Sequence, residues 1–141
     1  MSEHNIDVLR LSVEAYNARD VEAMLAHFDP AVELHSAFAA VGGGVYRGRE
    51  GVRNWHRDMQ DAWGSEIRVE PERYFDCGED LLMFWIVHGR GSHSGAEVAM
   101  PGALVTRWRD NRMTYWRSYA RREDALRDLG VTEEDLKPID T

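Results

Sequence analysis

The order of helical, extended and turn-forming segments constrains the fold of this chain more than any other feature. The spacing of apolar residues predicts a helix over residues 6–16, a short helix over 21–28 that Asp29-Pro30 ends, and a longer helix over 52–63. Extended segments are predicted at 31–38, 67–75, 81–87, 98–108 and 113–120, and a short closing helix at 121–129. This order predicts an α+β fold in which helices lie on one face of a strongly bent sheet. A sheet of this kind leaves a concave apolar cavity, which is a common form of small-ligand site.

One predicted strand is apolar on both faces. Residues Leu81 to Val87 are seven apolar residues in a row, and a strand of this composition must be covered twice. The helices can supply one cover. We expect a second copy of the chain to supply the other, which predicts a homodimer through the sheet.

Length and charge limit the class of protein. A chain of 141 residues is most simply one domain, here residues 1–141 with a core of about 5–130 and a short C-terminal tail. Seventeen basic and 25 acidic residues give a net charge of −8, so we expect no nucleic-acid partner and no binding to anionic membranes. The one cysteine, Cys77, excludes an internal disulfide, and no apolar run is long enough to span a membrane. The N-terminus also lacks the pattern of a signal peptide, so a cytoplasmic location is expected.

The three glycines at 42–44 predict a loop. They lie between the segments Phe28-Asp29-Pro30 and Tyr46-Arg47-Gly48-Arg49-Glu50-Gly51. With Tyr16-Asn17-Ala18-Arg19-Asp20 before them, these segments resemble the SnoaL-like branch of the nuclear transport factor 2-like superfamily over roughly residues 5 to 130. The resemblance implies a cone-shaped curled antiparallel sheet, backed by helices, around one pocket for a small, mostly apolar organic molecule. It implies less about the reaction, because this superfold hosts many chemistries as well as non-catalytic binders.

His35 is the first candidate for a catalytic residue. In the segment Ala31 to His35, it stands where the ketosteroid isomerase-like relatives carry their general-base aspartate. A histidine can accept or donate a proton near neutral pH. The alternation of Val32 and Leu34, however, places His35 with Glu33 on the opposite face of a regular strand, so only a bulge or a two-sided environment would bring it into the cavity. Both placements stay open.

Other groups that the resembling enzymes use are replaced in this chain. By the same resemblance, Ser12 stands at the tyrosine position and Ala103 at the acid position of the isomerases. Ser118 stands where the epoxide hydrolase-like and SnoaL-type proteins carry an aspartate, and Arg90-Gly91-Ser92 keeps an arginine without its acid. We therefore expect neither steroid isomerisation nor epoxide hydrolysis.

The remaining candidates surround the expected cavity. His88 and Arg90 lie two residues apart and share one face of a strand, unless the strand frays and leaves Arg90 in water. His88 is the second candidate base. The expected substrate-binding residues are Tyr16, Trp55, Arg90, Trp116, Ser118 and Tyr119. The histidines show no metal-ligand spacing, so no metal and no cofactor is expected.

Two functions remain open from the sequence. The first is a cofactor-independent enzyme of isomerase, cyclase or lyase type that acts on a small apolar organic substrate, with His35 or His88 as its base. The alternative is a non-catalytic ligand-binding or accessory protein that has lost the catalytic carboxylates. Convergence of His35 and His88 on one cavity would favour the enzyme.

Overall fold

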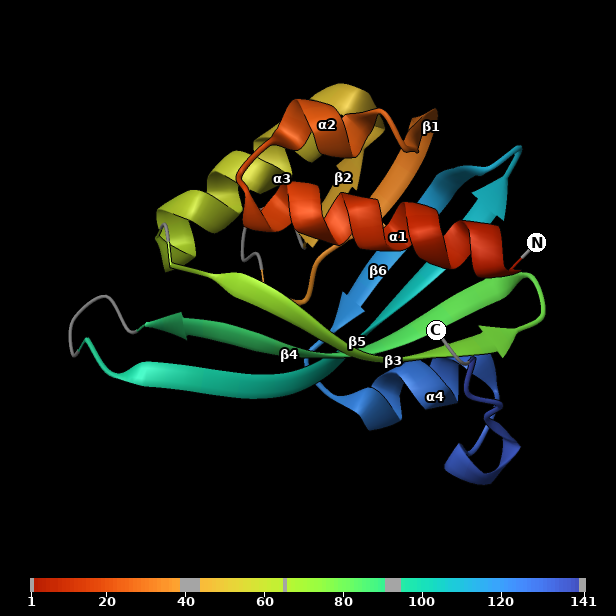
Figure 1. The fold of residues 1–141 in the computed structure, drawn as a ribbon. Helices are drawn as coiled ribbons and strands as arrows, with labels where there is room; N and C mark the ends of the chain where they lie inside the picture. The colour runs from red at the N-terminus through yellow and green to blue at the C-terminus, as the bar shows by residue number, and fades with distance from the viewer. Residues whose placement is uncertain (1, 39–43, 65, 91–94, 140–141) are drawn as a thin grey trace.

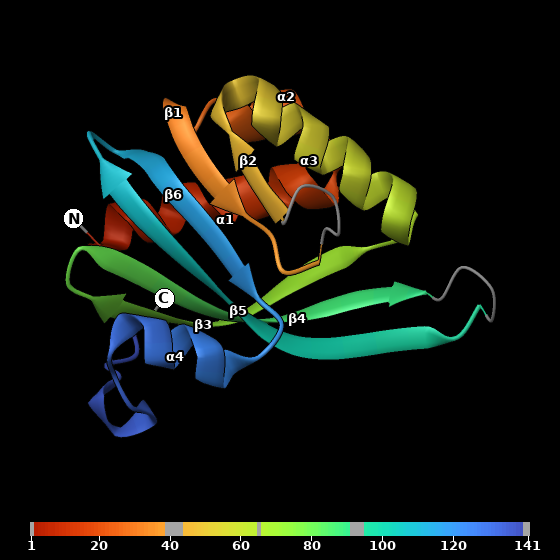
Figure 2. The same cartoon turned by 180° about the vertical axis from the view of Figure 1, so that it is seen from behind.

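Three helices and a curled sheet enclose the core in a computed structural model that describes residues 2–38, 44–64, 66–90 and 95–139. The helices α1 (Ser2–Asn17), α2 (Val21–Leu25) and α3 (Gly48–Trp63) lie on one face of the sheet, and α4 (Arg122–Leu129) lies on the other (Figures 1 and 2). The strands are β1 (Phe28–His35), β2 (Val45–Arg47), β3 (Arg68–Cys77), β4 (Asp80–Arg90), β5 (Glu97–Arg109) and β6 (Arg112–Tyr119). The predicted glycine loop at 42–44 lies mostly outside the described residues, since only Gly44 is described.

The sheet has the order β2-β1-β6-β5-β4-β3 and does not close on itself. All neighbouring strands are antiparallel except β1 and β6, which run parallel. The predicted α+β class and cone-shaped fold are therefore confirmed, with a mixed sheet in place of a purely antiparallel one.

The end of α2 differs from the prediction. The helix stops at Leu25, and β1 already begins at Phe28, whose side chain is fully buried. Pro30 therefore lies inside a strand. The proline is tolerated because the β1–β6 register is irregular between Phe28 and Glu33, where no regular ladder hydrogen bond is required.

The two-sided strand β4 is covered twice within the same chain. Leu81, Met83, Trp85 and Val87 belong to the main core below α1 and α3, while Leu82 and Phe84 are buried in a second cluster with Ala125 and Leu126 of α4. The expected second cover thus comes from α4 and not from a second copy. The homodimer stays a prediction, without the support that this strand was expected to give.

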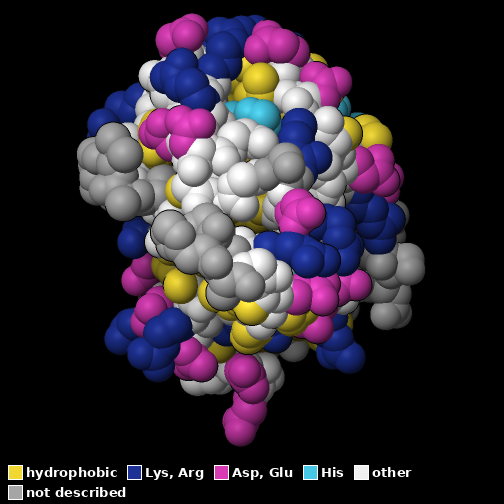
Figure 3. All heavy atoms as spheres, turned by 90° about the vertical axis from the view of Figure 1, so that its left-hand side faces the viewer, with side chains coloured by type: hydrophobic (Ala, Val, Ile, Leu, Met, Phe, Trp, Pro, Cys, Tyr) yellow, Lys and Arg dark blue, Asp and Glu magenta, His cyan; other side chains and the backbone are white. Residues whose placement is uncertain are grey.

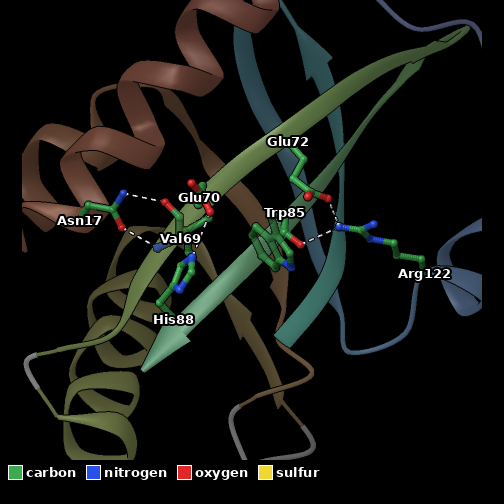
Figure 4. Close-up of polar contacts among 7 residues, drawn as sticks. All are labelled: Asn17, Val69, Glu70, Glu72, Trp85, His88 and Arg122. Atoms are coloured by element: carbon green, nitrogen blue, oxygen red, sulfur yellow. Dashed lines mark hydrogen bonds and ion pairs between the residues drawn. The ribbon is translucent and has the colours of Figure 1, made fainter. Parts of the chain in front are cut away.

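Arg122 fixes α4 to the outer face of the sheet. Its guanidinium donates hydrogen bonds to the carbonyl oxygens of Gly102, at 3.0 Å, and Trp85, at 2.9 Å, and lies over the Phe84 ring. It also pairs with Glu72 (Figure 4). The position of Trp85, whose indole lies on the inner face, is therefore fixed from the outer face as well.

The described surface carries mixed charge. On the face shown in Figure 3, acidic and basic side chains alternate and hydrophobic side chains form small separate patches. Leu11, 51% exposed, is the large hydrophobic residue exposed among those described. No helix in the described ranges is long and apolar enough to cross a membrane.

Candidate functional site

A pocket lies between the concave face of the sheet and the helices. Its walls come from α1, α3, β4, β6, the segment after β1 and the start of β3; the lining residues are Val13, Tyr16, Ser36, Phe38, Trp55, Met59, Ile67, Val69, Trp85, Val87, Trp116 and Ser118. The cavity volume of the pocket is about 20 Å³, room for roughly one water molecule. A larger ligand therefore requires side chains of the wall to move aside.

Aromatic rings form much of the pocket wall. Tyr16 stacks on Trp55, with ring centroids 5.4 Å apart, and Trp55 packs against Trp116 at 6.2 Å. Phe38 contacts Trp85 at 6.5 Å. Helical spacing explains the contribution of the helices, because Val13 and Tyr16 are three residues apart and Trp55 and Met59 are four apart.

Three residues of the pocket wall carry buried hydrogen-bond donors without partners. The Tyr16 hydroxyl and the indole nitrogens of Trp55 and Trp85 are buried and make no hydrogen bond to another described residue. Burial raises the pKa of the Tyr16 hydroxyl far above its usual value, against a smaller opposing effect of Arg19. Tyr16 therefore remains a protonated donor at every physiological pH.

Two serine hydroxyls on the pocket wall hold the backbone that follows β1. Ser118 Oγ accepts a hydrogen bond from the Ala37 backbone N–H at 2.9 Å, and Ser36 Oγ accepts one from the Phe38 N–H at 3.3 Å. Ser118 thus lies in the pocket where the resemblance implied an aspartate in relatives, and it already has a structural partner.

Ala103, the position at which the resemblance implied the isomerase acid, lies on β5. Ala103 faces the outer cluster with Phe84 and Tyr119, away from the pocket. Its neighbour Gly102 faces inward, and a Cβ there would lie 2.5 Å from Trp85 Nε1 and 2.7 Å from the Tyr119 carbonyl oxygen. The Trp85 indole therefore lies directly on the glycine.

His35 lies on the outer face of the sheet. Val32 and Leu34 point into the core, and His35 points with Glu33 to the other side. Its Nε2 lies 2.5 Å from Glu33 Oε1, and its ring centroid lies 5.3 Å from that of Tyr115. The hydrogen bond from His35 lowers the pKa of the Glu33 carboxyl. The register irregularity in β1 precedes Glu33, so it does not turn His35 inward.

His88 and Arg90 also lie away from the pocket. His88 Nε2 is 3.0 Å from Glu70 Oε1 (Figure 4), and this hydrogen bond lowers the pKa of Glu70. Arg90 is exposed and pairs with Glu66 at 2.8 Å. The next residues of the Arg90-Gly91-Ser92 segment lie outside the described residues.

Tyr119 is the last of the predicted binding residues and faces the outer cluster. Its hydroxyl donates a hydrogen bond to Asp128 Oδ2 at 2.9 Å, and burial together with this bond raises its pKa. The structure therefore brings four predicted residues together in the pocket wall, namely Tyr16, Trp55, Trp116 and Ser118. The other four predicted residues do not line the pocket, namely His35, His88, Arg90 and Tyr119. No group of three or more potential metal ligands occurs in the described ranges.

Sequence reasoning did not assign Trp85, Phe38, Met59 or Ser36 to the pocket. The alternation Leu81, Met83, Trp85, Val87 carries the signal for Trp85, but every residue of this strand is apolar, so the inward set is not distinguishable. Ser36 and Phe38 follow the inward alternation of Val32 and Leu34, and this pattern could have identified them.

The cone-shaped fold has an apolar pocket on its concave face. The family model of the SnoaL-like domain matches residues 9–116, so the chain belongs to this family. No curated protein matches the chain.

Solved structures share the fold at low sequence identity. TerC, co-crystallised with polyporic acid, has a TM-score of 0.74 and 20% identity, over 89% of this chain and 97% of that chain. A Mycobacterium tuberculosis protein in complex with estradiol-17beta-hemisuccinate has a TM-score of 0.68 and 19% identity, over 82% and 92%. A putative SnoaL-like polyketide cyclase from Jannaschia sp. CCS1 has a TM-score of 0.69 and 11% identity, over 83% and 85%.

Proposed function

We propose that this chain is a ligand-binding protein whose pocket takes a small, mostly apolar organic molecule. The observation that carries the proposal is the chemistry of the wall: no residue that lines the pocket in the described ranges has a carboxylate, imidazole, ammonium or guanidinium group. Aromatic and aliphatic side chains supply contact area, and a few neutral polar groups can orient the ligand.

Ligands of the similar structures support the same class. Polyporic acid with TerC and estradiol-17beta-hemisuccinate with the M. tuberculosis protein are both small organic molecules bound by a protein of this fold. At about 20% identity these structures indicate a shared architecture, so we take from them the class of ligand and not its identity.

An enzyme of isomerase, cyclase or lyase type is the second candidate. The putative polyketide cyclase from Jannaschia shares the fold, and the Tyr16 hydroxyl is a protonated group at the pocket that can polarise a carbonyl oxygen. Such a reaction also needs a base within reach of the substrate. His35 and His88, the expected bases, are each paired with a glutamate away from the pocket, which ranks this candidate second.

Binding measurements on three variants separate the two candidates. We expect small aromatic and terpenoid ketones to bind the wild type by isothermal titration calorimetry, and His35→Ala and His88→Ala to leave the affinity unchanged. Met59→Trp, which fills the pocket, should abolish binding, with circular dichroism as the control for folding. Loss of binding or of turnover in a histidine variant would overturn the proposal in favour of the enzyme.

We further propose that the chain acts as a homodimer in the cytoplasm. The support for the dimer is the strand β6, which has aromatic residues on both faces: Trp116 lies in the core, and the half-buried Tyr115 lies on the outer face. Sedimentation velocity should give twice the 16.2 kDa chain mass. A single species of the chain mass at micromolar concentration would contradict the dimer.

A further inference from the structure

The wall of the pocket is almost entirely buried. Every lining residue except Phe38 is buried, and the cavity volume is about 20 Å³. A molecule such as acetophenone does not fit this volume, which holds roughly one water molecule. Part of the wall must therefore move aside before a ligand can enter. The half-buried Phe38 is the lining residue at which the described wall reaches the solvent.

Two serines separate the pocket from a second cavity. Ser36 and Ser118 line the pocket and also line a cavity of about 400 Å³ on the outer side of the sheet. Exposed side chains such as Arg127 and Asp128 belong to the wall of this outer cavity, so it is in contact with the solvent. The partition between the closed pocket and the outer cavity is therefore thin at the two serines.

This partition lies where β1 and β6 cease to pair. Their parallel ladder ends with the pair His35 and Arg117. Beyond this pair, the Ala37 backbone N–H donates a hydrogen bond to Ser118 Oγ, at 2.9 Å, and not to a backbone carbonyl oxygen of β6. A side-chain hydroxyl thus closes the sheet at this point. Loss of one such hydrogen bond changes an equilibrium only about two- to tenfold.

The segment after β1 is held firmly at its beginning and weakly beyond it. The Ser36 N–H donates to the Gly44 carbonyl oxygen at 2.7 Å, which continues the pairing of β1 with β2. In the part of the chain that the structure describes, two hydrogen bonds then join Ala37 and Phe38 to the other elements. One is the bond to Ser118, and the other runs from an indole of α3 to the Phe38 carbonyl oxygen, at a long 3.4 Å.

The Phe38 ring is the part of the pocket wall that this segment carries. It contacts Trp63 and Trp85, with ring centroids 6.4 and 6.5 Å away. An outward rotation of the backbone after Ser36 would withdraw this ring from the pocket and break both hydrogen bonds. The pairing of β1 with β2 would stay intact, so this movement opens the pocket without unfolding the sheet.

Resting on the ligand-binding function proposed above, we propose that Ala37 and Phe38 form a gate through which the ligand enters, and that the Ser118 hydroxyl holds this gate shut. The gate opens toward the outer cavity and closes again over the bound ligand. Because the ligand enters and leaves only while the gate is open, the association and dissociation rate constants both scale with the open fraction, whereas their ratio, the Kd, does not.

Stopped-flow tryptophan fluorescence with acetophenone as the probe tests the gate. Ser118→Ala removes the acceptor of the Ala37 N–H. We expect both rate constants to rise together about two- to tenfold, as loss of one hydrogen bond in the closed gate predicts, with a nearly unchanged Kd. Ser12→Ala is the matched control, because it removes a buried serine hydroxyl that donates to the Val8 carbonyl and does not line the pocket. It should leave both rate constants unchanged.

A second variant weakens the gate without changing a residue that lines the pocket. Trp63→Phe keeps an aromatic ring beside Phe38 but removes the hydrogen bond to the Phe38 carbonyl oxygen. Both rate constants should rise again, by less than in Ser118→Ala because the lost bond is longer. Circular dichroism of all variants controls for folding.

The outcomes separate the gate from the function on which it rests. A change of Kd in Ser118→Ala through the dissociation rate constant alone would make Ser118 a ligand contact only and overturn the gate. Unchanged rate constants in both Ser118→Ala and Trp63→Phe would also overturn it. Either result leaves the ligand-binding function intact. Failure of acetophenone and of the other ketones to bind the wild type would overturn the ligand-binding function itself, and the gate with it.

Discussion

Gly102 is the residue on which the shape of the pocket depends most. Its backbone conformation needs no glycine. Its missing side chain allows the Trp85 indole to lie against β5, because a Cβ would meet Trp85 Nε1 at 2.5 Å and the Tyr119 carbonyl oxygen at 2.7 Å. The carbonyl oxygen cannot move without shifting β6. The absence of a side chain at Gly102 therefore determines where Trp85 lies in the pocket wall.

We predict that Gly102→Ala destabilises the chain and alters ligand binding together. An added methyl group in such a close contact should lower the free energy of unfolding by about 1–3 kcal/mol, as overpacking of a core typically does. Gly89→Ala is the matched control on the neighbouring strand, since a Cβ there meets nothing closer than 3.9 Å. Urea denaturation should show the loss for Gly102→Ala alone, and equal stabilities of the two variants would disprove the assignment.

At this scale the sequence predicted some positions and not others. The alternation in residues 31–35 already placed His35 beside Glu33, and the structure has this arrangement; the family resemblance alone suggested the pocket. Tyr16 lies one helical turn after Ser12, and spacing alone does not decide which of the two reaches a ligand. Ser12 instead donates its hydroxyl to the Val8 carbonyl within the helix at 3.0 Å.

At the scale of elements, Asn17 joins α1 to the edge of the sheet. Its side-chain nitrogen donates to the Val69 carbonyl oxygen at 2.9 Å, and its side-chain oxygen accepts the Val69 N–H at 2.8 Å (Figure 4). β3 is the last strand of the sheet and has no neighbouring strand beyond it. The Asn17 amide therefore makes the two hydrogen bonds with Val69 that a neighbouring strand would otherwise make. The clamp lies next to Tyr16 in the sequence and holds α1 over the pocket.

We predict that Asn17→Ala lowers the free energy of unfolding by about 1–3 kcal/mol, because two hydrogen bonds of roughly 0.5–1.5 kcal/mol each are lost. Hydrogen exchange of the Val69 amide should accelerate at the same time. Asn54→Ala is the control, since the Asn54 side chain accepts a hydrogen bond from the exposed Arg57 side chain of the same helix, and it should change little. A Val69 amide that stays protected in Asn17→Ala would argue against the clamp.

Element type was more predictable than element boundaries and neighbours. The helix over 52–63 and the strands after it follow from apolar spacing, and the turn at Asp110-Asn111 matches two residues with positive φ of 53° and 65°. The short helix after Asp20 ends early because Phe28 is needed in the core of the sheet. The cover of β4 by α4 is a long-range contact that no local pattern specifies.

At the scale of the whole molecule, His27 and His56, which are not among the residues that line the pocket, link stability to pH. Burial lowers the pKa of His27, and burial together with the Arg19 charge lowers the pKa of His56. The unfolded chain, with histidine pKa values of about 6.5, then binds more protons than the native chain below that pH. Stability is therefore complete above about pH 6.5 and decreases as the pH falls through this value.

We predict that the wild type loses stability between pH 7.5 and 5.5 and that the double variant His27→Gln with His56→Gln loses less. Urea denaturation at both pH values measures this difference. The carboxylates with lowered pKa values, such as Glu33 and Glu70, stay ionised throughout this range. The stability that they contribute is therefore lost only at lower pH. An equal loss in the double variant would show that other groups control the pH dependence.

We expect the ligand to contact the tryptophan-lined pocket and not the two candidate histidines. The chain has five tryptophans, so their indole N–H signals can be followed in a ¹⁵N-correlated NMR titration with acetophenone and assigned by single Trp→Phe variants. We predict that the signals of Trp55 and Trp85 move, while that of Trp108, which donates to Thr106 Oγ1 at 2.9 Å, stays in place. Movement of the His35 or His88 ring signals, with Trp55 and Trp85 unchanged, would contradict the account.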